Sequence, residues 1–360
     1  MHHFHALTVQ SVTPLTRDSA AITFAVPADL QETFHFVPGQ YLTLRYQIDS
    51  AELRRSYSIC ASAQSQQQGG PLRVAIKRVN GGVFSNWALD NLQPGSSLEV
   101  MPPQGHFTMP LAPESARHVL CVAAGSGITP VLSIVESTLL AEPHSRVTLI
   151  YGNRASGSVM FKEELENLKD RFLTRLNIVW VMSRETQDVP LFNGRIDGEK
   201  ISQIMKHWVD ASTVDVAFIC GPQSMMLAAS QAMQDAGIAK ERIKVELFGT
   251  ANTNDRAPRV VATTDAGCEV TVVMDGAQRV FHMPKDKNLV DAALAQGIEL
   301  PYSCKGGVCS TCRCKVTQGE VDMDINYALE DYEVARGFVL GCQSYPVSDK
   351  LVINYDAEQH

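Results

Sequence analysis

The sequence predicts a multi-domain protein: a small antiparallel β-barrel, then an α/β domain with a parallel sheet, then a cysteine-rich module. Three observations lead to this fold class. A chain of 360 residues is too long for one hydrophobic core. Short, partly alternating apolar segments fill residues 1–110, whereas continuous apolar strands alternate with helical patterns through residues 111–250. Five of the nine cysteines lie between positions 304 and 342.

The first module, residues 1–110, contains six short segments that are rich in β-branched and aromatic residues. They are "ALTVQSVT", "AAITFAV", "YLTLRYQI", "RSYSICA", "LRVAIKRV" and "SSLEVMPP". Glycine and proline separate them, as in "VPGQ" and "QPGSS". Antiparallel strands at this spacing predict a small barrel.

The second module, residues 111–250, alternates strands with helices. The expected strands are "HVLCVAA", "RVTLIYGN", "LNIVWVMS" and "DVAFICG", and the expected helices begin near Pro130 or lie in "VMFKEELENLKDRF", "DGEKISQIMKHWV" and "QSMMLAASQAMQDAG". This order predicts a parallel sheet, whose ligand sites lie at the carboxyl ends of the strands.

A polar segment with one proline, residues 251–262, is expected to be a linker. The third module, residues 263–360, has expected strands "CEVTVVMD", "QRVFHMP" and "KLVINYD" and one helix, "NLVDAALAQG". It also carries most of the charge, since its 15 Asp and Glu outnumber its 8 Lys and Arg, while the whole chain has a net charge of −8.

The composition limits the classes of function. No apolar run reaches the roughly 18–20 residues of a membrane span, and the N-terminus lacks the order of a signal peptide. An odd number of cysteines without an export signal favours a reducing compartment, so we expect a cytoplasmic protein. No basic footprint for nucleic acid is present. We therefore expect neither nucleic acid nor a membrane as a partner.

The segment "PYSCKGGVCSTCRCKV" places Cys304, Cys309 and Cys312 in one loop, and Cys342 follows after 29 intervening residues. This is the spacing of a plant-type [2Fe–2S] cluster, in which each iron needs two thiolates. Gly306 and Gly307 are expected to adopt positive φ and to bring N–H groups close to sulfur. The alternative is a structural zinc site, although zinc usually takes two short cysteine pairs. The remaining Cys314 is expected to be a small core residue.

The cysteine loop and residues 263–357 around it resemble plant-type ferredoxins. The resemblance implies a β-grasp ferredoxin domain with Cys304, Cys309, Cys312 and Cys342 as cluster ligands. The acidic surface then suits docking of a basic electron acceptor, or is simply a solvated face; composition does not separate these two.

The segment "RRSYSIC" resembles the R-x-Y-S motif of the ferredoxin–NADP reductase superfamily. Arg55 and Tyr57 lie on one face of a strand, where an arginine can grip a flavin phosphate and an aromatic ring can pack on the flavin. Ser58 can donate to flavin N5. Gly81, Gly82 and Ser85 open a helix whose N-terminus suits a phosphate. The resemblance implies FAD, although related phthalate dioxygenase reductases carry FMN. The alternative is a barrel strand with a surface arginine.

Two further segments resemble the nucleotide-binding motifs of that superfamily. In "AAGSGITPVLSI", Gly125, Ser126, Gly127 and Thr129 would face the pyrophosphate, with Thr129 capping the helix. In "ICGPQSMM", Cys220 would lie near nicotinamide C4. The resemblance adds Gly221, Pro222 and Met225 to that site, and places Phe248 over the flavin. A plain strand–helix turn and a buried cysteine are the structural alternatives.

A preference for NADPH requires cations at the 2′-phosphate, and "YGNR" and "MSRET" supply candidates after two strands. They are Arg154, Ser183 and Arg184. Either arginine could equally be a surface residue. The balance favours NADPH over NADH.

The order of the motifs predicts electron flow from NADPH to FAD to the [2Fe–2S] cluster, with Ser58 and Cys220 at the hydride transfer. Almost the whole chain resembles the family of phenylacetyl-CoA epoxidase reductase subunits (PaaE). This resemblance implies a di-iron oxygenase of a multicomponent complex as the electron acceptor. The alternatives are a ring-hydroxylating oxygenase, a fatty-acyl desaturase, a hybrid-cluster protein, or a non-catalytic carrier or sensor.

Overall fold

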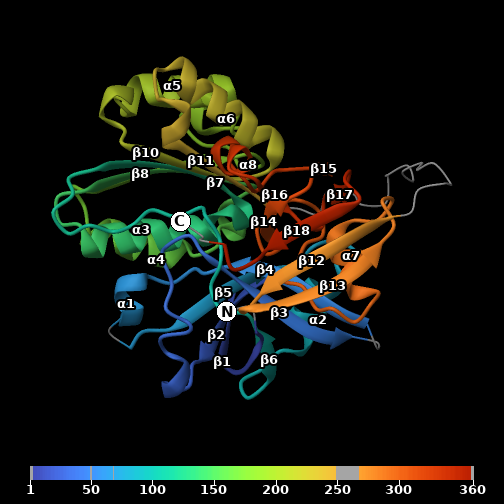
Figure 1. Ribbon diagram of the computed structural model, residues 1–360. Coiled ribbons are helices and arrows are strands. Elements are labelled where there is room, and N and C mark those ends of the chain that lie inside the picture. The colour runs from blue at the N-terminus through green and yellow to red at the C-terminus, as the bar shows by residue number, and fades with distance from the viewer. Residues whose placement is uncertain (1–2, 49–50, 68, 249–266, 358–360) are drawn as a thin grey trace. The chain divides into compact units, whose positions relative to one another are not determined.

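The computed structural model describes residues 3–48, 51–67, 69–248 and 267–357 (Figure 1). These residues form two compact units. The larger contains the described residues of 4–53 and 57–248, and the smaller contains the described residues beyond 248 together with residue 3 and residues 54–56. The expected linker, residues 251–262, lies outside the described residues.

The first half of the larger unit is a six-stranded antiparallel sheet with the strand order β4-β3-β6-β1-β2-β5. The strands are β1 His5–Thr16, β2 Ser19–Ala25, β3 Tyr41–Ile48, β4 Ala51–Ser58, β5 Leu72–Lys77 and β6 Ser97–Val100. An antiparallel bridge between Ile59 and Val74 joins the two edge strands. This bridge closes the sheet into the predicted barrel, which removes its free edges. Helices α1 (Ala63–Gln67) and α2 (Val83–Asn91) follow β4 and β5.

The second half is a five-stranded parallel sheet with the order β11-β10-β7-β8-β9. Its strands are β7 His118–Ala124, β8 Arg146–Asn153, β9 Leu176–Met182, β10 Val216–Gly221 and β11 Ile243–Leu247. Helices α3 (Ile128–Ala141) and α4 (Lys162–Arg171) cover one face, and α5 (Gly198–Trp208) and α6 (Gln223–Asp235) cover the other (Figure 1). The strand order reverses at β7, so a crevice for ligands is expected where β7 and β10 end.

The barrel and the parallel sheet are packed together through one hydrophobic cluster. Phe107 and Met109 pack among side chains of β7 and α3. Three polar contacts reinforce this packing: Ser133 Oγ donates to Ala61 O at 2.7 Å, Ala63 N donates to Ser137 Oγ at 3.0 Å, and Arg73 forms a bidentate pair with Glu164 at 2.7 and 2.9 Å. Because charge-assisted bidentate contacts fix orientation, the barrel is held in a defined position against the parallel sheet.

The smaller unit contains a five-stranded mixed sheet with the order β13-β12-β18-β14-β16 and a separate pair, β15 with β17. The strands are β12 Cys268–Met274, β13 Ala277–Met283, β14 Arg313–Gln318, β15 Val321–Met323, β16 Phe338–Leu340, β17 Ser344–Pro346 and β18 Lys350–Asn354. The helices are α7 Leu289–Leu294 and α8 Asp331–Ala335. Leu289, Ala292 and Ala293 of α7 pack into the core beneath the sheet. This architecture confirms the predicted three-part fold class.

No helix in the described part of the chain has both the length and the apolar character needed to cross a bilayer.

Candidate flavin, nucleotide and cluster sites

The carboxyl ends of β7, β10 and β11 lie side by side in the larger unit. In the parallel register, Ala123 of β7 is opposite Cys220 of β10, and Cys220 is opposite Glu246 of β11. The three residues therefore form one row at the edge of the sheet where ligands bind in parallel α/β folds. Sequence reasoning predicted Cys220 for this position and missed Glu246.

The glycine-rich loop after β7 packs directly against the end of β10. Gly125–Gly127 form a single turn of 3₁₀ helix, and α3 begins at Ile128. A Cβ atom on Gly127 would lie 2.2 Å from Cys220 O, so a side chain cannot be accommodated without movement of the backbone. The hydroxyl of Tyr151, a fully buried residue of β8, donates to Gly125 O at 3.0 Å. Two neighbouring strands thus fix the shape of this loop.

Thr129 does not cap α3, contrary to the sequence prediction. Gly127 occupies the N-cap position, and the Thr129 hydroxyl instead donates to Ser126 O at 3.0 Å. The helix starts two residues earlier than a threonine cap would require, because the 3₁₀ turn runs straight into it. Ser126 remains half-exposed beside the first turn, whose free N–H groups can face a phosphate.

Ser58, Cys220 and Glu246 converge from the barrel and from two strands of the sheet. Ser58 Oγ donates to Glu246 Oε2 at 3.3 Å. Although part of Glu246 is accessible, its carboxyl group lies among buried groups, and this burial raises its pKa to about 8. Burial, and then the nearby Glu246, raises the pKa of Cys220 well above its ordinary value. At neutral pH the site therefore holds a thiol and a mostly protonated carboxyl group.

The residues predicted to hold the flavin are spread over the barrel. Arg55 and Tyr57 alternate along β4, and the Tyr57 ring lies 5.8 Å from the ring of Phe84 at the start of α2. Gly81 has a φ of 72°, and Gly82 is the N-cap residue of α2.

Ser85 and Phe248 complete the predicted flavin set. The Ser85 hydroxyl accepts from Val79 N at 3.2 Å, which orders the turn predicted to bind a phosphate. Phe248 follows β11 and packs against the cluster shared by barrel and sheet.

The residues predicted for the nucleotide lie along the same edge of the parallel sheet. Gly221 and Pro222 join β10 to α6, and the Met225 side chain packs where a Cβ on Gly221 would be. Arg154 follows β8, whereas Ser183 and Arg184 follow β9. Since β8 and β9 lie on one side of β7 and β10 lies on the other, these groups lie on both sides of the glycine loop along one edge of the sheet.

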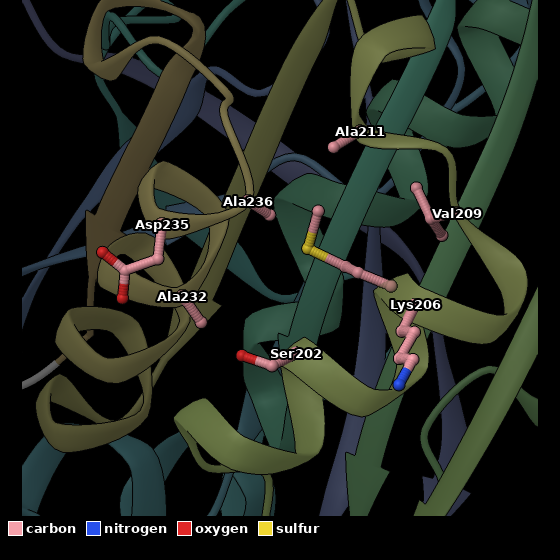
Figure 2. Close-up of a pocket in the computed structure, with 8 residues that line it drawn as sticks. Ser202, Lys206, Val209, Ala211, Ala232, Asp235 and Ala236 are labelled. Carbon is pink, nitrogen blue, oxygen red and sulfur yellow. The ribbon is translucent and has the colours of Figure 1, made fainter.

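A pocket of about 280 Å³ lies elsewhere, between α5 and α6 (Figure 2). It is lined by Ser202, Met205, Lys206, Val209, Ala211, Ala232, Asp235 and Ala236. These residues belong to the carboxyl-terminal halves of both helices and the loop after α5. Because crossover helices run antiparallel to the strands, this end of the sheet is opposite to the glycine loop, and the pocket is separate from the nucleotide site.

In the smaller unit, the four predicted ligand thiols approach one another as two pairs. Cys309 Sγ lies 3.1 Å from Cys304 Sγ, and Cys312 shares a hydrogen bond with Cys342. Within the described residues, no group of His, Cys, Asp or Glu is arranged to hold a single metal ion. Two cysteine pairs fit the donor set of a cluster with two irons, each of which takes two protein thiolates.

Positive φ occurs in the cluster loop at Lys305 (51°) and Gly307 (75°), and not at Gly306 as predicted. The left-handed Lys305 turns the following N–H inward, so that Gly306 N donates to Cys304 Sγ at 3.3 Å. At Gly307, an added Cβ would lie 2.9 Å from Ile325 O. The glycine that the loop needs for its turn is therefore the second of the pair.

Hydrogen bonding lowers the pKa of one thiol in each pair, whereas the same hydrogen bond, together with burial, raises the pKa of its partner, Cys309 or Cys312, well above the ordinary value. The Cys309 thiol and then the N–H groups of Gly306, Cys309 and Val308 lower the pKa of Cys304 to about 6, against the effect of burial. Cys312, Gln343 and Gly307 act in the same way on Cys342, whose pKa is lowered. Burial raises the pKa of Cys314 to about 12, which agrees with its predicted place in the core.

Comparison with known protein families matches all three parts of the chain. Residues 6–109 match the oxidoreductase FAD-binding domain, residues 121–231 match the oxidoreductase NAD-binding domain, and residues 272–347 match the 2Fe-2S iron-sulfur cluster binding domain. The chain is 46% identical over 359 residues to a subunit of 1,2-phenylacetyl-CoA epoxidase from Escherichia coli K12, with 99% of both chains covered. The chain belongs to the family of that subunit.

A second relative is the ferredoxin reductase component of 3-ketosteroid-9-alpha-monooxygenase from Rhodococcus rhodochrous. It is 37% identical over 357 residues, with 97% of this chain and 96% of the relative covered. Among solved structures, phthalate dioxygenase reductase is similar in fold, with a TM-score of 0.59, 23% identity and 98% of each chain covered. Both similarities therefore extend over all three modules.

The family assignment fits the residues that the structure brings together. The chain is an NAD(P)H-dependent oxidoreductase with FAD and a [2Fe–2S] cluster, and electrons pass from the nucleotide through the flavin to the cluster. The 2Fe-2S match and the two thiol pairs favour the [2Fe–2S] cluster over the alternative of a structural zinc site. The FAD-binding match answers the FMN alternative in favour of FAD.

Proposed function

We propose that this chain is the reductase component of a multicomponent di-iron oxygenase that epoxidises the aromatic ring of phenylacetyl-CoA in phenylacetate catabolism. The observation that carries the proposal is its 46% identity, over 99% of the chain, with a subunit of 1,2-phenylacetyl-CoA epoxidase. The oxygenase subunits are its partners, NADPH is its electron donor, and its location is cytoplasmic. Its domains are residues 1–110, 111–250 and 263–360, with the linker 251–262 between the last two.

Bound FAD supplies the exchange between a two-electron hydride donor and a one-electron cluster, and the protein positions the partners. Arg55, Gly81, Gly82 and Ser85 hold the flavin phosphates, whereas Tyr57 and Phe248 pack on the ring. With flavin bound, the Ser58 hydroxyl would turn its proton from Glu246 Oε2, 3.3 Å away, to flavin N5, and the protonated carboxyl group of Glu246 would then donate to Ser58 Oγ in return. A protonated Glu246 leaves the site without a negative charge that would oppose hydride arrival.

The nucleotide is held from the other side of the same row. Gly125, Ser126, Gly127 and Thr129 form the pyrophosphate loop, and Cys220, Gly221, Pro222 and Met225 form the nicotinamide end. Because Cys220 is fully buried and protonated, it provides packing and excludes water at the reacting carbon. Arg154, Ser183 and Arg184 receive the 2′-phosphate. Cys304, Cys309, Cys312 and Cys342 ligate the cluster.

The test is reconstitution with purified components. The holoprotein is mixed anaerobically with NADPH, and flavin bleaching and the low-temperature EPR signal of a reduced [2Fe–2S] cluster are followed. The reduced protein is then added to purified di-iron oxygenase subunits with phenylacetyl-CoA and oxygen. We expect epoxide formation that consumes NADPH in a 1:1 ratio. Cluster reduction without turnover of these oxygenase subunits would contradict the proposed acceptor.

A second candidate acceptor is the oxygenase of a ketosteroid monooxygenase, because a reductase component of that system is 37% identical over nearly the whole chain. The same reduced protein, added to that oxygenase with a 3-ketosteroid, distinguishes the two acceptors. Faster turnover there than with phenylacetyl-CoA would favour the second candidate. A protein with bound flavin and cluster that neither nucleotide reduces would instead indicate a carrier or sensor.

A further inference from the structure

Three loops are joined by main-chain hydrogen bonds at the carboxyl end of β8 and β9. Ser183 N donates to Asn153 O at 2.9 Å, and Arg184 N donates to Arg154 O at 2.7 Å, so the loops after β8 and β9 run together. Gly194 N donates to Met182 O at 2.8 Å, which attaches the segment before α5 to the end of β9. Arg154, Arg184 and Arg195 therefore come from three loops that meet at one edge of the sheet.

Packing fixes the third loop as firmly as the hydrogen bonds do. The side chain of Ile196 is buried, and its Cδ1 lies 2.8 Å from the position that a Cβ on Gly152 would occupy. Gly152 is a residue of β8 and lies two positions before Arg154, which follows the strand. Both neighbours of Arg195 are therefore fixed: Gly194 by its hydrogen bond to the end of β9, and Ile196 by its packing against Gly152 of β8. The Arg195 side chain itself is exposed.

The three arginine side chains have no partner among the residues that the structure describes. Arg154, Arg184 and Arg195 are all exposed, and none of them forms an ion pair, a side-chain hydrogen bond or a ring contact there. Other arginines of the chain are paired with carboxylates, for example Arg73 with Glu164 and Arg117 with Glu142. Three exposed cations on adjoining loops, with no acid paired to any of them, present an unneutralised surface for an anion.

The acids of the same loops are bound elsewhere or do not pair with these arginines. Glu185 accepts from Ser156 N at 2.7 Å and from the Ser156 hydroxyl, and these bonds lower its pKa. Asp197 is the N-cap residue of α5 and accepts from Lys200 N at 2.8 Å. Asp188 is exposed and makes no ion pair with any described arginine. Glu185 therefore joins the loop after β9 to the loop after β8, and its oxygens are not available to accept from a ribose hydroxyl.

We propose that Arg195 is a further specificity-determining residue, which binds the 2′-phosphate of NADPH together with Arg154 and Arg184. This inference rests on the proposed use of NADPH and adds a residue that the sequence motifs did not predict. A phosphate monoester dianion offers three terminal oxygens, and arginine forks bind such oxygens with directed, charge-assisted hydrogen bonds. The hydrogen bonds from Ser156 to Glu185 and the main-chain hydrogen bonds hold the three loops side by side at this edge of the sheet.

The test compares two fragments that differ only in the phosphate, 2′,5′-ADP and 5′-AMP, by isothermal titration calorimetry on the holoprotein. The measured quantity is the selectivity, defined as the Kd for 5′-AMP divided by the Kd for 2′,5′-ADP. We expect Arg195→Ala to lower this selectivity about tenfold, and we expect the same of Arg154→Ala and Arg184→Ala. Arg195→Lys should keep more of it than the alanine variant does, because the charge remains.

Arg242→Ala is the matched control. Arg242 is also exposed and lies directly before β11, at the amino end of the sheet, so this variant removes one positive charge far from the nucleotide. Its selectivity should equal that of the wild type. An equal loss in Arg242→Ala and Arg195→Ala would overturn the proposal, since only net charge would then matter.

Two further outcomes separate this inference from the proposed function. If Arg154→Ala and Arg184→Ala lower the selectivity and Arg195→Ala does not, Arg195 lies outside the site and only this inference fails. If the wild-type selectivity is near one, the preference for NADPH fails and the inference fails with it. Reduction of the flavin and the cluster by NADH would still support the proposed electron transfer in that case.

Discussion

Cysteines serve two opposite purposes in this chain, and the comparison of Cys304 with Cys220 shows what separates them. Both lie in largely enclosed positions. Cys304 is surrounded by donors, the Cys309 thiol and three main-chain N–H groups, and its pKa falls to about 6. Cys220 is fully buried beside an acid, and burial, followed by the nearby Glu246, raises its pKa well above the ordinary value.

Burial opposes ionisation of both thiols, and the difference teaches that only Cys304 has enough hydrogen-bond donors to outweigh it. In the cluster loop, the left-handed Lys305 and Gly307 turn N–H groups toward sulfur, which stabilises negative charge. At the strand ends, the Ser58 hydroxyl is a weak donor to Glu246, burial outweighs it, and charge is disfavoured. One site is built to hold negative charge and the other to exclude it until hydride arrives.

The largest expected effect is the loss of the cluster from Cys342→Ser. The variant removes one thiol of the Cys312–Cys342 pair, so one iron lacks a ligand. Iron analysis and low-temperature EPR of the dithionite-reduced protein should show no normal [2Fe–2S] signal, while the flavin stays bound and is reduced by NADPH. Cys314→Ser is the matched control, because Cys314 is a buried core thiol and should leave the signal intact. A normal cluster in Cys342→Ser would contradict the ligand assignment.

The second effect is expected from Gly127→Ala in the larger unit. An added Cβ would lie 2.2 Å from Cys220 O, so the glycine loop and the end of β10 must separate. Such overpacking costs about 1–3 kcal/mol. Thermal unfolding should show a lower Tm, and the Kd for NADP⁺ should rise at least tenfold. Gly157→Ala, where an added Cβ meets no atom within 4 Å, should keep the wild-type Tm. Equal Tm values for the two variants would show that the contact is not maintained.

The two sites also differ in what the sequence could predict. Three of the four cluster cysteines lie within nine residues, so their spacing alone indicates the chemistry. Ser58 and Glu246 are 188 positions apart, and they meet only because the barrel packs on the sheet and because β10 and β11 pair in the register Cys220–Glu246. No local pattern carries that register, which is why Glu246 was missed.

The same distinction holds for the fold. Strands with continuous apolar sequence, such as β7 and β8, were predicted with their observed bounds. The short strands β15, β16 and β17, three residues each, have no alternation long enough to detect and were not predicted. The left-handed residue Lys305 was also missed, since glycine is the residue that sequence reasoning expects at positive φ.

A third prediction sharpens the electrostatic side of the comparison through Glu246→Gln. The pKa of Glu246 is about 8, so the group is mostly protonated at pH 7 and loses its proton as the pH rises through 8. The negative charge formed above this pKa opposes the arrival of hydride at a neighbouring flavin. Stopped-flow reduction by NADPH should therefore slow about tenfold between pH 7 and pH 9 in the wild type.

Glutamine keeps the size and the hydrogen-bonding ability of the side chain but does not titrate, so the Glu246→Gln variant should lack this decrease. The same decrease in both proteins would show that another group controls it. Glu185→Gln is the comparison variant. Hydrogen bonds from Ser156 lower the pKa of Glu185, so this carboxylate stays ionised from pH 7 to pH 9. The Glu185→Gln variant should therefore keep the decrease in the reduction rate.

The smallest expected effect concerns the support of the glycine loop and comes from Tyr151→Phe. Tyr151 is fully buried in β8, and its hydroxyl donates to Gly125 O at 3.0 Å from beneath the loop. A neutral hydrogen bond of this kind contributes about 0.5–1.5 kcal/mol, which corresponds to a rise of roughly twofold to tenfold in the Kd for NADP⁺. The ring itself stays in place, since phenylalanine fills the same space against Trp180, whose ring lies 5.8 Å away. The hydroxyl orients the loop and does not touch the reacting atoms, so KM for NADPH should rise while kcat stays within about twofold. A fall in kcat at unchanged KM would place the effect of Tyr151 at the hydride-transfer step instead, and the loop would then not depend on this bond.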